Sequence, residues 1–148
     1  MSDSIKVYTL GFAGRTAAQF FGVLREAGVK RVVDVRLNNV SQLAGFTKRE
    51  DLRFFLRELC GADYWHELLL APSKDILDDY RKTHSWEEYT RRFLALLAER
   101  RVEAQVSRDL FDVPAALLCS EPKPDKCHRR LVLEYLQDKW GGLEPIHL

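Results

Sequence analysis

The side chains best suited to chemistry gather between positions 119 and 129, where an apolar run ends and a helical pattern begins. This segment contains two thiols, Cys119 and Cys127, together with Glu121, His128 and Arg129. A thiol at a helix N-terminus has a lowered pKa, because the unpaired backbone N–H groups and the helix dipole stabilise its thiolate. The same N–H groups and an arginine side chain bind phosphate or carboxylate groups. The segment therefore indicates anion recognition, thiol chemistry or both.

Each of these side chains has a role that fits its chemistry. We predict Cys127 as a nucleophile or redox thiol, and His128 and Glu121 as groups that move protons. Arg129 is predicted to hold an anion, and Cys119 to contribute to the ligand site.

Three alternatives apply to the two thiols. Cys127 lies at helical spacing with Leu131 and Tyr135, as a small core residue would, and buried free cysteines are common. A reversible disulfide between Cys119 and Cys127 is also conceivable, although it would be transient in the cytosol. Both cysteines and His128 are ligand types for zinc, but the chain has no C-x-x-C pair, and adjacent helical positions diverge by about 100°. We therefore predict no metal and keep a metal-binding module as a second alternative.

A second candidate group follows the apolar run at 31–36. Alternation along a strand places Asp34 and Arg36 on the same face, where Asp34 would move protons and Arg36 would hold an anion. The alternative is a structural ion pair. Ser41, in the loop that follows, and Gly11, in a glycine-rich turn after the first apolar run, complete the predicted ligand set. The turn at 11–16 matches neither G-x-G-x-x-G nor a Walker loop, so its phosphate signal is weak.

Short β-rich runs alternate with amphipathic stretches along the chain. Strands are expected over 5–10, 31–36, 62–66, 115–119 and 144–148. Helices are expected after three capping boxes that begin at Thr16, Thr47 and Ser85, and over 126–139 behind a capping Asp125. This order predicts a single three-layer α/β domain over residues 1–148, with a mostly parallel central sheet flanked by helices. Ligands of such sheets bind beyond the carboxyl ends of the strands.

The composition narrows the partners. The 148 residues include 23 Lys and Arg against 22 Asp and Glu, so nucleic acid is a candidate partner but not a favoured one. No run approaches the roughly 20 apolar residues of a membrane helix, no secretory signal is evident, and three cysteines do not make a disulfide framework. We predict a cytoplasmic protein with a small anionic ligand. Cofactor and oligomeric state stay open.

Three segments, YTLGF, VVDVRLNNVSQLAGFTKREDL and LLCSEPKPDKCHR, together closely resemble the family called domain of unknown function 488. The resemblance extends from about Val7 to Leu148 and implies a compact single-domain α/β protein. Many members carry Pro soon after the Asp-x-Arg, where this chain has Asn38 and Asn39, and many carry Tyr where it has Phe12. The family's signature falls on Gly11, Asp34, Arg36, Ser41, Phe46, Cys119, Glu121, Cys127, His128 and Arg129.

The resemblance implies a site but no reaction. From the residues we expect a protein that binds a phosphate- or carboxylate-bearing ligand, with nucleotides among the candidates, and that uses a thiol in an enzymatic reaction. The main alternative is a non-catalytic module that binds nucleic acid or a nucleotide.

Overall fold

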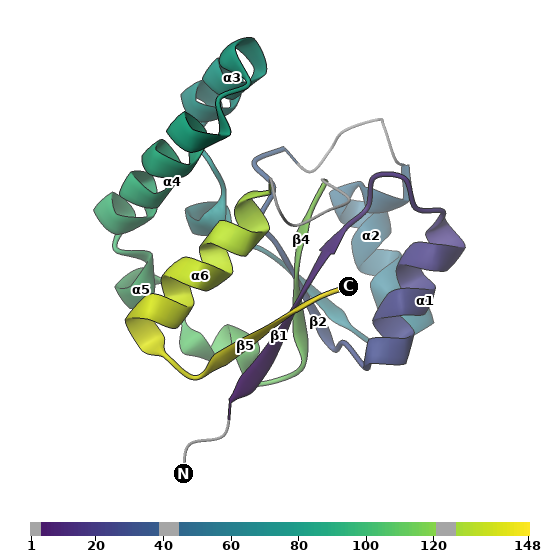
Figure 1. Cartoon of the computed structure of the whole chain (residues 1–148). Helices are drawn as coiled ribbons and strands as arrows, with labels where there is room; N and C mark the ends of the chain where they lie inside the picture. The colour runs from purple at the N-terminus through teal and green to yellow at the C-terminus, as the bar shows by residue number, and fades with distance from the viewer. Residues whose placement is uncertain (1–3, 39–44, 121–126) are drawn as a thin grey trace.

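A central sheet of five parallel strands organises the chain (Figure 1). The computed structural model describes residues 4–38, 45–120 and 127–148. The sheet has the order β3-β2-β4-β1-β5, and every pairing is parallel. Its strands are β1 (Ile5–Gly11), β2 (Arg31–Asp34), β3 (Asp63–His66), β4 (Ala115–Cys119) and β5 (Leu143–His147).

Helices cover both faces of the sheet and confirm the three-layer α/β prediction (Figure 1). One face packs against α1 (Ala17–Ala27), α2 (Arg49–Phe55) and the helical turn Leu56–Cys60 that continues it. The other packs against α4 (Trp86–Arg100), α5 (Val102–Gln105) and α6 (His128–Trp140), with α3 (Lys74–Thr83) beside α4. Short helical turns lie at Gly45–Thr47, Leu68–Leu70 and Arg108–Phe111. Among the residues that the structure describes, no helix is long and apolar enough to cross a membrane.

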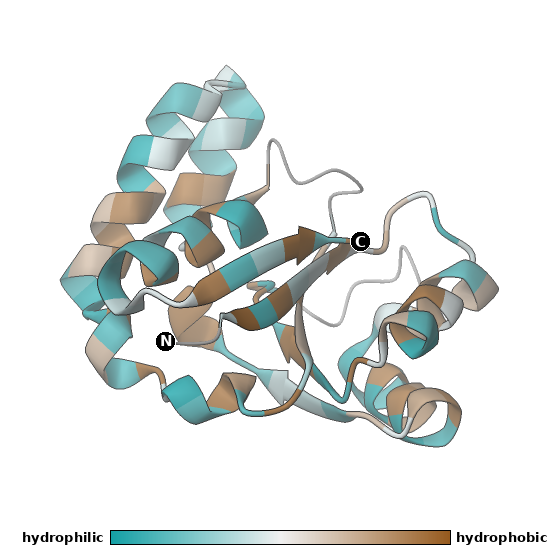
Figure 2. Ribbon diagram, turned by 60° about the horizontal axis from the view of Figure 1, so that its bottom comes forward, coloured by the Kyte–Doolittle hydropathy of each residue, from teal (hydrophilic) through white to brown (hydrophobic). Residues whose placement is uncertain are grey.

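Strand β4 contributes side chains to the hydrophobic cores on both faces of the sheet. All five of its residues are buried, as expected for a continuous apolar run in the middle of a parallel sheet. Leu117 and Cys119 pack toward α4 and α6, whereas Ala116 and Leu118 pack toward α1 and α2. Figure 2 shows hydrophobic residues, in brown, along the strands of the sheet. The side chain of Cys119 is thereby directed to the α6 face.

The helix starts agree only partly with the predicted capping boxes. Thr16 forms a complete capping box with Gln19, and the Ser85 side chain accepts a hydrogen bond from the Glu88 N–H. The prediction for Thr47 is wrong, because this residue ends the turn Gly45–Thr47 and α2 begins behind Lys48 without a side-chain cap.

Strand ends differ from the prediction by one residue in β1, β3 and β5, and two boundaries beside the site differ in ways that matter for it. The N-cap of α6 is Cys127 rather than Asp125, which lies outside the described residues. Strand β2 stops at Asp34 instead of Arg36. The reason is local: the Asp34 carboxylate accepts the backbone N–H of Arg36 at 3.1 Å, which turns the chain away from the ladder.

The connections create a crevice at the carboxyl end of β4. The chain leaves β1 and β2 toward α1 and α2 on one face, but it leaves β4 toward α6 on the opposite face. Because β4 lies between β1 and β2, the connections diverge on both sides of it. Such a topological switch point is where open α/β sheets bind their ligands.

Candidate functional site

A pocket of about 270 Å³ lies at this switch point. Its sheet side is lined by residues that follow β1, β2 and β4, and its other side by residues of α3 and α4. Among the residues on the sheet side are Phe12, Arg36, Cys119, Ser120, Cys127 and His128. Four of the predicted site residues therefore share one cavity.

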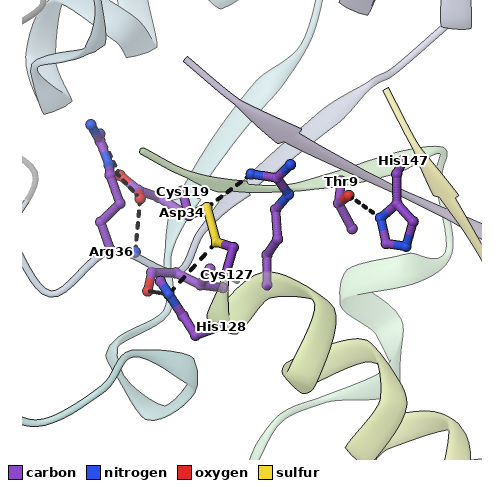
Figure 3. The surroundings of a disulfide bond; sticks show 9 residues. Thr9, Asp34, Arg36, Cys119, Cys127, His128 and His147 are labelled. Carbon is purple, nitrogen blue, oxygen red and sulfur yellow. Dashed lines mark hydrogen bonds and ion pairs between the residues drawn. A yellow bond between two sulfur atoms is a disulfide. The ribbon is translucent and has the colours of Figure 1, made fainter. Parts of the chain in front are cut away.

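The two cysteines approach one another from different elements. Cys119 ends β4, and Cys127 is the N-cap of α6. Both are buried, and their sulfur atoms are joined in a disulfide (Figure 3). The third cysteine, Cys60, is a free thiol on the other face of the sheet. Only the pair predicted for chemistry lies at the pocket.

His128 presents a hydrogen-bond acceptor to this pair. Its Nε2 lies 2.6 Å from the carbonyl oxygen of Val35, which can only accept, so Nε2 carries the proton. The other ring nitrogen, Nδ1, lies 4.0 Å from the Cys127 sulfur. Burial is the main cause that lowers the pKa of His128 to about 4; the Val35 hydrogen bond and the charge of Asp34 oppose it, and the charge of Arg129 adds to it. The imidazole is therefore neutral at pH 7, with its free lone pair on the side of the thiol.

Arg129 contacts sulfur instead of lining the pocket. Its side chain is fully buried, and Nη1 lies 3.0 Å from the Cys119 sulfur, to which it donates. A guanidinium is charged at every accessible pH, so its contact favours the thiolate whenever Cys119 is reduced. The two thiols thus have different neighbours: a cation beside Cys119 and a neutral imidazole beside Cys127.

Asp34 and Arg36 form the buried ion pair that strand alternation allows. Nε and Nη2 of Arg36 each lie 2.8 Å from one of the two carboxylate oxygens (Figure 3). Tyr64 donates its hydroxyl to the same carboxylate at 2.6 Å, and Nη2 of Arg36 also donates to the Thr47 carbonyl at 2.7 Å. The guanidinium lies over the ring of Phe12, 5.4 Å from its centroid. Asp34 therefore fixes Arg36, and Arg36 is the member of the pair that reaches the pocket wall.

The turn after β1 is tied to the strand-end loop of β4. Gly11 lies opposite Cys119 in the parallel ladder. The N–H groups of Phe12 and Ala13 donate to the carbonyls of Cys119 and Ser120 at 3.3 and 3.0 Å. These donors are used to join the two strand ends, so the contribution of this turn to the pocket is the ring of Phe12. The remaining predicted site residues, Ser41 and Glu121, lie outside the described part of the chain.

Sequence reasoning did not find the far wall of the pocket. Tyr80, Arg81 and Trp86, from α3 and the start of α4, line the cavity together with Tyr89. The sequence predicts no helix over 74–83, and it gives no binding role to Trp86 and Tyr89, which lie on the helix expected after the capping box at Ser85. Three aromatic residues on both sides of a capping serine were the available signal. Within the described ranges, no group of three or more His, Cys, Asp or Glu side chains is placed to hold a metal ion.

The fold and the pocket define a three-layer α/β protein with a cysteine pair at the switch point of a parallel sheet. The family described as "Domain of unknown function DUF488" matches residues 16–136, and the chain belongs to this family, as its signature segments predicted. No curated protein and no solved structure matches the chain.

Proposed function

We propose that the protein is a thiol-dependent reductase that binds a small anionic substrate in the pocket and reduces it with the Cys119–Cys127 pair. One observation carries this proposal: the two sulfur atoms are within bonding reach of one another inside the pocket at the switch point. A lone nucleophile needs no second thiol, whereas a dithiol that closes to a disulfide delivers two electrons.

Anion binding is supported by the charges around the pocket. Arg36 is held at the wall by its ion pair with the buried carboxylate of Asp34, and it is the guanidinium of this pair that lines the pocket. Cys127 and His128 place the N-terminus of the 13-residue helix α6 at the same wall, with its dipole favouring a negative group. An anionic substrate is therefore held next to the thiols.

The reduced pair has the asymmetry that a two-step exchange requires. The Cys127 sulfur adds to the electrophilic atom of a double bond in the oxidised substrate; the π electron pair moves to the other atom of that bond, which takes up the first proton. The thiolate of Cys119, stabilised by Arg129, then attacks the Cys127 sulfur. This step forms the disulfide and returns the electron pair of the broken bond to the substrate. Overall, the dithiol loses two electrons and two protons, which the substrate gains, and an external dithiol reduces the disulfide again.

His128 positions the thiol of Cys127. A neutral imidazole with a pKa of about 4 is too weak a base to hold the proton of a thiol of ordinary pKa near 8.5. Its Nδ1 lone pair instead orients the S–H group, and the proton goes to the substrate atom that receives the displaced electron pair. An anion bound beside the ring raises the pKa of His128, because a negative neighbour favours the imidazolium. Substrate binding and proton acceptance are thereby coupled.

The chain contains its own control for a test of the thiols. Protein is treated with iodoacetamide with and without prior reduction, at graded pH, and each cysteine is followed by mass spectrometry. We expect Cys60 to be labelled in both samples, and Cys119 and Cys127 only after reduction. The reduced pair should include one thiol that reacts well below pH 8.5. Burial raises the pKa of Cys60, so this thiol should react only at higher pH.

The variants Cys119→Ser and Cys127→Ser should each abolish reduction of any small anionic substrate that the Cys119–Cys127 pair reduces. The variant Cys60→Ser should not. The proposal fails if all three cysteines are labelled equally without reductant, or if both pocket thiols titrate like free cysteine after reduction.

The basic side chains give little support to a nucleic-acid-binding module, since Arg129 is fully buried and Arg15 donates to the Leu148 carbonyl at 2.9 Å.

A further inference from the structure

We infer that the α3–α4 wall of the pocket is a stacking subsite for a planar heteroaromatic ring, so that the ligand is a mononucleotide or a compound of the same two-part chemistry. This inference rests on the anion site of the proposed function and names its ligand class. It does not depend on the thiol reaction.

The wall offers a rigid aromatic surface. Trp86 and Tyr80 are partly exposed, and their ring centroids lie 5.9 Å apart at an angle of 67°. Tyr89 is buried behind Trp86 and stacks on it, with centroids 4.9 Å apart and ring planes 14° from parallel. Stacking against a buried ring holds the indole in one orientation. A ligand ring therefore meets a preformed surface.

The same aromatic column reaches the thiol site. Tyr89 also stacks on Phe93, with centroids 5.9 Å apart, and Phe93 meets the ring of His128 edge-on at 5.6 Å. The column fixes α4 against the start of α6, so the distance between the stacking wall and the cysteine pair is set by packed side chains. A ligand whose ring stacks on Trp86 and whose other end lies near Cys127 must therefore span a fixed distance.

Positive charge lies at both sides of the cavity. Arg36 is on the sheet side and Arg81 on the α3 side, where the largely exposed Arg81 side chain makes a 3.5 Å ion pair with Asp78. Asp34 pairs with Arg36 and Asp78 with Arg81, but neither carboxylate lines the pocket. The guanidinium groups are therefore the charged groups that a ligand meets there, and arginine suits phosphate in particular.

The size of the pocket restricts the ligand to one ring and one short anionic arm. The volume of about 270 Å³ is slightly below the roughly 300 Å³ at which small-molecule sites commonly start. A polymer would need an open groove. Phe12, on the side opposite α3, adds a second aromatic contact. An aromatic wall, a second aromatic contact and two arginines together match a nucleobase that carries a phosphate.

Tryptophan fluorescence gives a direct test, because only one of the three tryptophans lines the pocket. The double variant Trp65→Phe/Trp140→Phe keeps Trp86 as the sole reporter. It is titrated with AMP, GMP, CMP and UMP, with adenosine as a ring-only probe, and with ribose 5-phosphate and inorganic phosphate as anion-only probes. We expect at least one mononucleotide to quench Trp86 with a Kd about tenfold or more below those of all partial probes.

A variant separates stacking from general damage. Trp86→Leu should weaken the mononucleotide about tenfold in calorimetry and leave the affinity for ribose 5-phosphate unchanged. The matched control Trp65→Leu, which removes an exposed tryptophan outside the pocket, should change neither. The inference is overturned if ribose 5-phosphate binds as tightly as every nucleotide, or if Trp86→Leu weakens both ligands equally.

The two proposals fail separately. The double variant Cys119→Ser/Cys127→Ser should still bind the mononucleotide, since stacking and charge are intact without thiols. Binding by this variant together with inert thiols in the alkylation experiment would remove the reductase and keep the nucleotide site. Reactive thiols without any nucleotide-dependent quenching would remove the nucleotide site and keep the reductase.

Discussion

Removal of the Tyr64 hydroxyl tests the structural basis of the Arg36 position. Tyr64 donates to the Asp34 carboxylate at 2.6 Å, and this carboxylate is fully buried. The change Tyr64→Phe keeps the ring in the core and removes one donor from a buried anion. A hydrogen bond to a charged group contributes about 1.5–3 kcal/mol, so the free energy of unfolding should fall by this amount.

The loss is measured by urea unfolding followed by circular dichroism, with an unchanged m-value. For a domain of this size, 1 kcal/mol corresponds to roughly 2–4 °C, so Tm should fall by about 3–12 °C. Tyr135→Phe is the matched control. The hydroxyl of Tyr135 donates to Glu103 at 2.8 Å, but Glu103 is partly exposed. Because solvent screens this carboxylate, the control should lose less than about 1 kcal/mol.

A double-mutant cycle with Asp34→Asn isolates the pair. We expect Tyr64 and Asp34 to be coupled by about 1 kcal/mol or more, as residues in one hydrogen-bond network are. Equal losses for Tyr64→Phe and Tyr135→Phe, or additive effects in the cycle, would refute the view that this network is an anchor.

Three further predictions concern the histidine, a helix cap and the buried arginine. By NMR the ring of His128 should titrate near pH 4. Between pH 6.5 and 4 the folded state then binds fewer protons than the unfolded state. The free energy of unfolding should therefore fall by up to about 3 kcal/mol as the pH falls through this window. His128→Gln should reduce that slope, with the remainder coming from groups such as His147, whose pKa burial also lowers, and an unchanged slope would contradict the assignment. Thr16→Ala breaks the 3.1 Å cap to the Gln19 N–H and should cost about 1 kcal/mol in urea unfolding, whereas a loss below about 0.3 kcal/mol would argue against the capping box. Arg129→Met should raise the pKa of reduced Cys119 and slow its alkylation at pH 7, Arg129→Lys should keep the charge and much of the rate, and equal rates in all three proteins would disprove the role of the guanidinium.

The elements on the sheet side of the site could be predicted from local pattern alone. The run Ala115–Cys119 is apolar throughout, and it forms the strand that is buried on both faces. Strand alternation placed Asp34 and Arg36 on one face, and the structure confirms that they pair with each other. Each of these signals lies within a few residues, which is the range over which side-chain patterning acts.

The assembly of the site could not be predicted, because it depends on long-range packing. Nothing in the pattern specifies that β4 lies between β1 and β2, and this order brings the Arg36 side chain to the pocket of Cys119. The lowered pKa of His128 arises from burial, which also requires the folded neighbours. The pocket wall on α3 was missed for a similar reason: α3 packs mainly on α4, and its polar sequence has too few apolar positions to reveal that contact.

The strand order also has a consequence for the way the chain folds during synthesis. The first strand, β1, pairs with the last two, with Val7 opposite both Ala115 and Pro145. A nascent chain can pair β2 with β3 early, but β1 has no partner until most of the polypeptide has left the ribosome. Insertion of β4 between β2 and β1 is therefore a late event. Until then Cys119 has neither Arg129 nor Cys127 beside it, so the two cysteines come together only after folding is nearly complete.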